Sequence, residues 1–435
     1  MMRPTLHVLS SSVLSSMVRF VLCCWLFLVS AAPALADDLT INAVKLTTFP
    51  AAKMLTLAPL LRENDAVLVE SGPKGELKQL TMATLVAAHP GSVRDALIHP
   101  ERYPDFVRNI TKSSVQQNPD GTIDHFYELS YSLLTLQGVH RYLMLPAEAP
   151  GATAPVEVFD VHPNSNRVRH YRWEFLPVGG GCMVVLYGYS DSHMPGTMIE
   201  QFLTKVPSLE HGLSLVTQLS LLLSMKKRAE QSANPNIAQS FPPPGNVSYE
   251  FLLQRGTLIL PRTQGGRLSD ISMVTASSAS PDGLLRVASQ VGGWSGFVPS
   301  ISKSDAATGS DGATSVDLKQ SLPYMSWRTN FNVKTGVGWV DMFGTSGDLQ
   351  NGRMRWDVRG AANMPSKLVL RLSLAYAQSS MLLRQLYKLE PLFEYGITVG
   401  LTLVVFQSVK QQAERTSPAV VTPPPSPAPA PAPSK

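Results

Sequence analysis

The pattern of apolar and polar positions predicts a series of short strands that ends in one long helix. Short runs of alternating apolar and polar residues favour strands, and the Gly, Pro and Asn residues between them favour turns. Leucines recur every three or four residues near residue 215, which is typical of an amphipathic helix. We expect strands at 66–70, 77–88, 110–116, 122–135, 138–145, 156–161, 167–176 and 182–190, short helices at 91–98 and 101–107, and a long helix at 198–230.

Three segments of the chain recur later in the same order. Residues 84–110 align with 275–301 at a shift of 191, and residues 207–230 align with 391–414 at a shift of 184. A third match, at a shift of 183, lies between these blocks. A repeat of this length indicates a duplicated domain. The aligned pairs include Tyr103 with Trp294, Phe106 with Phe297, Arg172 with Arg355 and Trp173 with Trp356.

The repeat predicts an α+β protein with two tandem domains of the helix-grip type. In each, a curved antiparallel sheet wraps around the long C-terminal helix, because no other element is long enough to cover the apolar face of the sheet. The expected division is a signal peptide at 1–36, a first domain at 37–231, a Pro-rich linker at 232–246, a diverged second domain at 247–415 and a disordered Pro/Ala-rich tail at 416–435.

The N-terminus has the pattern of a secretory signal. The apolar run Phe20–Val29 is too short to span a bilayer, and Ala34 and Ala36 provide the small residues that a signal peptidase reads. We expect an exported protein, periplasmic or extracellular, that is cleaved after Ala36; an uncleaved anchor is the alternative. Only Cys182 then remains of the three cysteines, which excludes an internal disulfide in the mature chain.

The net charge says little about binding partners. The formal net charge is +5, and no basic run is interleaved with aromatic residues, so we expect no nucleic-acid partner. This balance is compatible with transient contact with an anionic membrane surface. The sequence identifies no protein partner.

No motif for catalysis, metal binding or cofactor binding stands out. No two histidines have metal-ligand spacing on a helix, and Cys182 has no basic partner near it in the sequence. Every histidine after His7 belongs to the first copy, so any chemistry is expected there. We expect no catalytic residue, no metal and no cofactor.

Aromatic and polar residues within the expected strands are candidates for the lining of a cavity between sheet and helix. Strand alternation directs only one residue of each adjacent pair inward, and the sequence does not decide which. The alternative is that these residues lie on a solvated outer face. The candidates are Tyr103, Phe106, Tyr127, Tyr131, His140, Arg172, Trp173, Tyr187, Leu213, Val216 and Leu219 in the first copy, and Trp294, Phe297, Trp327 and Trp356 in the second, with His125, Tyr142 and Tyr189 as further strand residues of the same kind.

The segment Val86–Ile110 resembles the opening of the START-like (SRPBCC) superfamily, which includes polyketide cyclases and coenzyme Q-binding START-type proteins. The resemblance is carried by a strand, a proline-started helix and the acidic-aromatic-proline segment Glu101–Phe106, and it covers most of 66–231. The second copy lacks the acidic residues and the proline in Gly292–Phe297. The resemblance implies a helix-grip fold; the superfamily hosts carriers, cyclases and hydrolases, so fold alone does not fix function.

Three functions remain open at this point. The first is an exported carrier or binding protein for a hydrophobic molecule such as a lipid, a quinone or a polycyclic compound. The second is a cyclase- or hydrolase-type enzyme that uses polar residues in the cavity of the first domain. The third is a ligand-free interaction module whose cavities are filled by their own side chains.

The signal pattern generates a first prediction: the mature chain begins at Asp37 and is recovered outside the cytoplasm. The reason is that Ala34 and Ala36 place the cleavage site directly before it. N-terminal sequencing of fractionated protein measures this. A cytoplasmic protein that retains Met1 would contradict it.

Overall fold

The computed structural model describes residues 43–72, 75–131, 134–161, 168–191, 200, 203, 209–264, 267–310, 313–322, 325–360, 366–373 and 391–417. The expected signal peptide and all but the first two residues of the expected tail lie outside the described residues. So does most of the stretch between residues 191 and 209, where the long helix was expected to begin.

The first half of the described chain, residues 43–231, follows the predicted order of elements, and the α+β class is confirmed. The second predicted helix is a 3₁₀ helix. The elements are α2 (Ala51–Leu55), η1 (Leu60–Arg62), β1 (Ala66–Ser71), β2 (Leu77–Val86), α3 (Pro90–Ile98), η2 (Pro100–Asp105), β3 (Ile110–Gln117), β4 (Ile123–Tyr131), β5 (Leu134–Met144), β6 (Val156–Asp160), β7 (Arg169–Val178), β8 (Gly181–Ser190) and α5 (Leu209–Gln231).

The second half, residues 247–417, repeats this order after a short connection. The elements are η3 (Pro235–Ser240) in the connection, then α6 (Glu250–Leu253), β9 (Thr257–Gln264), β10 (Arg267–Ser277), α7 (Pro281–Ser289), η4 (Val291–Gly296), β11 (Ile301–Thr308), β12 (Thr314–Leu322), β13 (Met325–Gly336), β14 (Trp339–Gly347), β15 (Arg353–Arg359), β16 (Ser366–Ser373) and α9 (Pro391–Thr416). No helix in the described part of the chain is both long and apolar enough to cross a membrane.

The equivalent helices α3 and α7 begin in the same way. Each has a proline at its first position, where the missing N–H costs nothing. The preceding residue caps the helix: the His89 ring accepts from the backbone N–H of Gly91, and the Ser280 hydroxyl from that of Gly283. A short local signal thus fixes where both helices begin.

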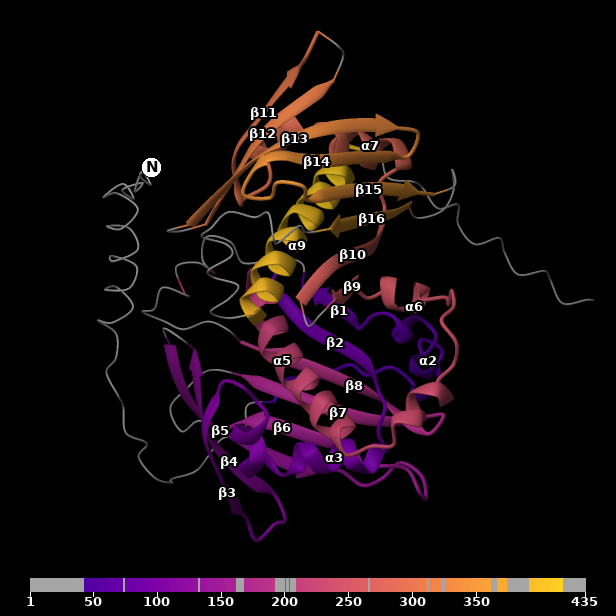
Figure 1. Cartoon of the computed structure of the whole chain (residues 1–435), viewed down its shortest axis with the longest axis vertical. Helices are drawn as coiled ribbons and strands as arrows, with labels where there is room; N and C mark the ends of the chain where they lie inside the picture. The colour runs from indigo at the N-terminus through magenta and orange to yellow at the C-terminus, as the bar shows by residue number, and fades with distance from the viewer. Residues whose placement is uncertain are drawn as a thin grey trace, which may run out of the picture.

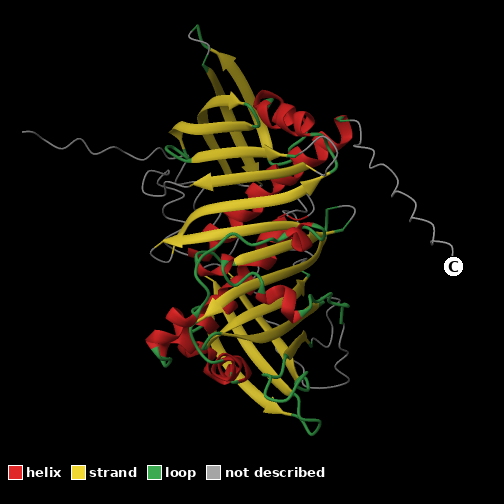
Figure 2. Cartoon of the chain, turned by 90° about the vertical axis from the view of Figure 1, so that its right-hand side faces the viewer, coloured by secondary structure: helices red, strands yellow, loops and turns green. Residues whose placement is uncertain are grey.

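All the described strands form one antiparallel sheet that runs through both halves. The order is β11-β12-β13-β14-β15-β16-β10-β9-β1-β2-β8-β7-β6-β5-β4-β3, so β1 and β9 are the junction. Figure 2 shows the strands as one continuous stack along the molecule. The halves therefore share backbone hydrogen bonds as well as side-chain contacts.

The junction has nearly two-fold symmetry. Val67 of β1 pairs with Ile259 of β9, and these residues hold equivalent positions, because each pairs with a methionine of the next strand, Met82 or Met273. Both strands meet their own counterpart, as in a symmetric dimer interface. Arg255 strengthens the junction from the second half, since its guanidinium lies 2.5 Å from the buried carboxylate of Glu70.

The central strands are buried on both faces. Val67 and Val69 face the cluster that includes α5 and α9, whereas Ala66 and Leu68 face a second cluster around α2 and α6. This follows from strand alternation, in which successive side chains point to opposite faces. Figure 1 shows α5 and α9 in front of the sheet, with α2 and α6 on its other side.

The two long helices cross at a pair of equivalent glycines. A Cβ atom on Gly212 of α5 would lie 2.5 Å from the carbonyl oxygen of Gly396 on α9, and one on Gly396 would lie 2.2 Å from Val216. The repeat aligns Gly212 with Gly396, so the helix crossing, like the β1–β9 junction, brings equivalent residues of the two copies together. Only glycine permits this backbone approach.

We predict that Gly212→Ala destabilises the whole chain by about 1–3 kcal/mol, because the added methyl overpacks the helix crossing. Chemical denaturation with a two-state fit measures the change. Gly293→Ala is the matched control, since a Cβ there meets no atom within 4 Å. Equal effects of the two substitutions would show that the crossing is not tightly packed.

Candidate functional site

The face of the first-half sheet toward α5 carries buried polar and aromatic side chains. They come from the inward positions of four neighbouring strands, from η2 and from α5. Strand pairing brings them together, since His125 lies opposite His140 and His140 lies opposite Asp160. We call this set the His/Tyr cluster: Tyr103, His125, Tyr127, His140, Tyr142, Asp160, Arg169, Tyr171 and Gln218.

A directed chain of hydroxyls closes one side of the cluster. The Tyr103 hydroxyl donates to the carbonyl of Leu97 at 2.7 Å and lies 3.2 Å from the Tyr142 hydroxyl. Because the Tyr103 proton is used on a carbonyl, Tyr142 must be the donor to Tyr103. Burial raises the pKa of both phenols, so both remain protonated at neutral pH.

One cation lies inside the cluster. Arg169 donates to the Tyr127 hydroxyl at 3.1 Å, and its Nε lies 3.9 Å from the carboxylate of Asp160. Burial would lower the pKa of Arg169, but the nearby Tyr127, Tyr171 and Asp160 raise it, so Arg169 is charged. Burial raises the pKa of Tyr127 to about 12. The cluster therefore holds the Arg169–Asp160 ion pair beside neutral phenols.

The two histidines are neutral. Burial lowers the pKa of His125 to about 4 and that of His140 well below its ordinary value. His140 lies 4.5 Å from the ring of Tyr127, measured between centroids, and 6.2 Å from the ring of His125. Nδ1 of His125 and Nε2 of His140 are buried and have no hydrogen-bond partner among the described residues.

Gln218 brings an amide from α5 into the cluster. Glycine at position 188 makes room for it, since a Cβ there would lie 2.2 Å from the Gln218 amide oxygen and 2.9 Å from Tyr171. Gln218 is 2% exposed, and neither its amide nitrogen nor its amide oxygen has a partner in the part of the chain that the structure describes. An unpaired buried amide of this kind costs about 1–3 kcal/mol.

Gly138 plays the same role for Tyr127 on the opposite strand. A Cβ at position 138 would lie 2.4 Å from the Tyr127 hydroxyl oxygen. The Tyr127 ring therefore lies across β5 and reaches Arg169. Two glycines in strands, normally unfavourable there, make space for two polar side chains.

The second half builds the same face mainly from apolar residues. Strand pairing identifies the equivalent positions, because the hairpins that carry them have the same register. Thr402, the counterpart of Gln218, donates to the carbonyl of Thr398 in its own helix. The strand counterparts are Val316 for His125, Leu318 for Tyr127, Phe331 for His140, Val333 for Tyr142 and Met354 for Tyr171.

Several residues that the sequence selected lie in or beside the cluster. Tyr103, Tyr127 and His140 belong to it, and Trp173 is fully buried on the same face of the sheet. Arg172 and Tyr187 lie on the opposite face. Arg172 pairs with Glu174, and the Tyr187 hydroxyl accepts from the backbone N–H of Phe49. Alternation thus selects Trp173 over Arg172. The side chain of Tyr131 lies outside the described residues.

The helix residues and the second-half aromatics are parts of the core. Leu219 is buried, whereas Leu213 and Val216 are half-buried and pack against the core cluster. In the second half, Trp294 and Trp356 are fully buried, with their ring centroids 5.7 Å apart, and the ring of Trp356 stacks on that of Phe406. Trp327 is also buried there, and Phe297 is half-buried.

Four members of the cluster were not selected from the sequence: Asp160, Arg169, Tyr171 and Gln218. The alignment of the two copies could have indicated two of them, since Tyr171 aligns with Met354 and Gln218 with Thr402, which are less polar or smaller. Where a polar or aromatic residue of one copy aligns with a less polar residue of the other, the fold can form without a polar side chain at that position.

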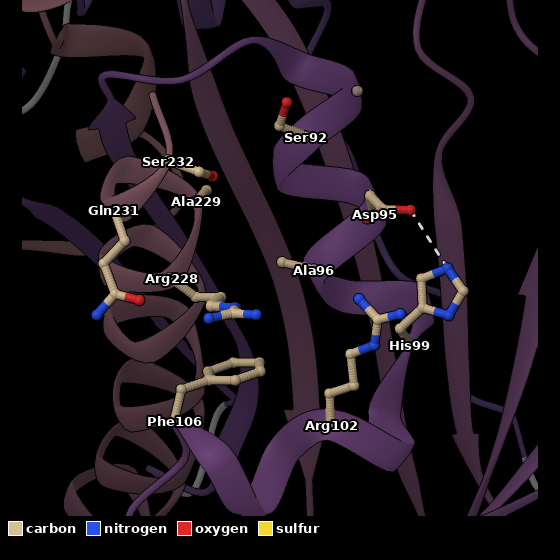
Figure 3. A pocket seen from close by; sticks show the side chains of 11 residues that line it. Ser92, Asp95, Ala96, His99, Arg102, Phe106, Arg228, Ala229, Gln231 and Ser232 are labelled. Carbon is tan, nitrogen blue, oxygen red and sulfur yellow. Dashed lines mark ion pairs between the residues drawn. The ribbon is translucent and has the colours of Figure 1, made fainter. Parts of the chain in front are cut away.

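A separate groove lies on the outside of the first half, between α3, η2 and the end of α5. It has a volume of about 690 Å³. Figure 3 shows Phe106 beneath Arg228, whose guanidinium lies 5.6 Å from the ring, and His99 paired with Asp95 at 3.3 Å. Phe106 therefore lines this open groove. Among the described residues, no three His, Cys, Asp or Glu side chains form a group that could hold a metal ion.

No protein-family model and no curated protein matches the chain. Similar solved structures include the di-domain ARO/CYC protein BexL of the BE-7585A biosynthetic pathway, at 12% identity and a TM-score of 0.28, with 79% of this chain and 99% of that chain covered. They also include a STAR-related lipid transfer protein from Xanthomonas axonopodis (15% identity, TM-score 0.31, 38% and 94% covered) and the Zhui aromatase/cyclase from Streptomyces sp. R1128 (11%, 0.30, 36% and 96%). At these TM-scores the likenesses carry no argument about ligand or activity. The START-like resemblance rests on the segment Val86–Ile110 and on the order of elements in the first half, which the second half repeats.

We predict that acid destabilises the chain partly through His125. The folded state lowers its pKa from 6.5 to about 4, so the unfolded state binds more protons between these values and the free energy of unfolding falls as the pH falls. At 1.36 kcal/mol per pKa unit, the loss by pH 4 is about 3 kcal/mol. His125→Val should lose correspondingly less stability between pH 7 and pH 4 in denaturant titrations. Ser114→Ala, on the exposed part of β3, should keep the full dependence.

Proposed function

We propose that the chain is a binding protein for a hydrophobic molecule with a polar end, and that the first half holds this end in the His/Tyr cluster. The apolar part would lie along α5, beside half-buried Leu213 and Val216. Ligand-binding pockets in proteins generally combine an apolar wall with a few polar groups that set the orientation of the ligand.

The observation that carries this proposal is the difference between the two halves. Both copies have the same strands and the same register, yet the inward face carries histidines and tyrosines in the first and mainly apolar residues at the equivalent positions of the second. The apolar face shows that the fold does not need these polar groups. Unpaired buried groups such as the Gln218 amide weaken a fold, so a ligand that pairs them is the simplest reason to keep them.

The histidines favour binding over acid–base catalysis. A general base works best when its pKa lies near the working pH, and His125 has a pKa of about 4. A neutral buried histidine of this kind is suited to a hydrogen bond with a ligand. The arrangement therefore supports the carrier hypothesis better than the cyclase or hydrolase hypothesis.

We further propose that each half is a helix-grip domain, with its sheet against α5 or α9, and that the chain acts as a carrier outside the cytoplasm. The contacts of α5 with β2 and β8, and of α9 with β10, support the first point. The Phe20–Ala36 signal pattern supports the second.

Native mass spectrometry of the purified chain, followed by solvent extraction, tests the proposed function. We expect a bound apolar molecule, or uptake of one when a fluorescent lipid or a polycyclic probe is added. A chain that arrives empty and takes up neither probe would overturn the proposal in favour of the interaction module.

We predict that His140→Phe, which installs the residue found at the equivalent second-half position, keeps the fold and weakens probe binding by roughly tenfold or more. Removing an unpaired buried nitrogen costs no hydrogen bond within the described chain, so the melting temperature should stay the same or rise. Thermal denaturation and a fluorescence titration measure the two effects.

Tyr187→Phe is the control for this substitution. It removes one hydroxyl from the opposite face of the same sheet, where that hydroxyl accepts from the Phe49 N–H. Probe binding should be unchanged while stability falls by about 1 kcal/mol. If His140→Phe lowers stability and leaves binding intact, the cluster is a structural network.

A further inference from the structure

We infer that the ligand of the first half carries an uncharged hydrogen-bond donor, an alcohol or a phenol, that binds Nδ1 of His125. This inference rests on the proposed function and specifies the chemistry of the ligand end in the cluster. It follows from the position of one proton on the His125 ring.

Ser113 fixes that proton. The Ser113 hydroxyl lies 2.5 Å from the carbonyl oxygen of Pro100 and 2.8 Å from Nε2 of His125. A carbonyl oxygen can only accept, so the single Ser113 proton is used on Pro100. The contact between Ser113 and His125 is then a hydrogen bond only if Nε2 carries the proton and donates it.

The other ring nitrogen is consequently a bare acceptor. A neutral imidazole carries one N–H, so a proton on Nε2 leaves a lone pair on Nδ1. The His125 ring is 1% exposed, and Nδ1 has no hydrogen-bond partner within the described ranges. The low pKa of His125 keeps this lone pair free of a second proton at neutral pH.

The neighbouring phenols are already engaged elsewhere. The Tyr103 hydroxyl donates to Leu97, and Tyr142 donates to Tyr103. The Tyr127 hydroxyl accepts from Arg169, and its ring centroid lies 5.5 Å from that of His125. None of these hydroxyls is a hydrogen-bond partner of Nδ1, which has none among the described residues, so a donor for its lone pair has to come from a ligand.

The ligand end that fits is an O–H group. A ketone, an ether or a carboxylate offers only acceptors and leaves the histidine lone pair unpaired. Sites built to hydrogen-bond a hydroxyl discriminate strongly against analogues that lack it, because a buried polar group is then left without a partner. An aromatic alcohol suits a cluster in which the rings of Tyr103, Tyr127 and Tyr142 surround His125.

Paired probes test this inference on the full chain. We expect 1-naphthol to bind at least roughly tenfold more tightly than 1-methoxynaphthalene, which has the same ring system without the donor. In His125→Val the preference should disappear. In Ser113→Ala it should shrink, because the ring proton is no longer fixed on Nε2. Ser114→Ala, on the exposed part of the same strand, should keep the wild-type ratio.

The ¹⁵N spectrum of histidine-labelled protein reads the proton position without any ligand. We expect His125 with Nε2 protonated and Nδ1 bare, and a mixture of both tautomers in Ser113→Ala. Equal affinity for the two probes, or a proton on Nδ1 in the wild type, would overturn the inference while leaving hydrophobic binding in place. Failure to take up either probe would remove the proposed function and this inference with it.

Discussion

The architecture depends on the antiparallel pairing of β1 with β9. Three residue pairs join the halves here, from Val67 with Ile259 to Val69 with Thr257, and they make one sheet out of two. The central strands are then covered on both faces, so that apolar residues on either face of the junction are shielded from water. The crossing of α5 and α9 at Gly212 follows from the same geometry, since helices on one face of a joined sheet must meet at the join. The position of α5, and with it Gln218, therefore depends on α9 of the other half as well as on α3, β2 and β8 of its own.

The His/Tyr cluster differs from the apolar core that the second half has at the equivalent positions. The second half fills the same space with residues such as Val316 and Phe331, which need no partners, and its aromatic core closes with Trp356 stacked on Phe406. The first half instead keeps neutral histidines, a half-buried arginine and an unpaired buried amide. Part of its stability therefore depends on how well these polar groups are hydrogen-bonded. Local rules of stability are usually broken where a protein works.

Much of the fold was predictable from the sequence because its signals are local. Prolines at the start of α3 and α7, glycine-rich turns and the period of the apolar residues gave strand and helix positions within a few residues. The face of each strand was not predictable, since Arg172 and Trp173 are adjacent and both neighbour apolar residues. Their placement depends on which side α5 packs, a tertiary contact. The junction of the halves was missed for the same reason: edge pairing between β1 and β9 leaves no mark on either strand alone.

The symmetry of the junction bears on how the two halves can vary. In a symmetric homodimer every substitution appears twice, so a change that suits one copy is forced on the other. Here the equivalent residues Val67 and Ile259, and Gly212 and Gly396, are encoded separately. Each position is free to drift or be selected independently while the contact between copies is maintained. Fusion also makes association independent of protein concentration, because the partner is always tethered. One copy can then keep a well-packed core while the other carries less stable buried polar groups, and the two copies still cannot dissociate.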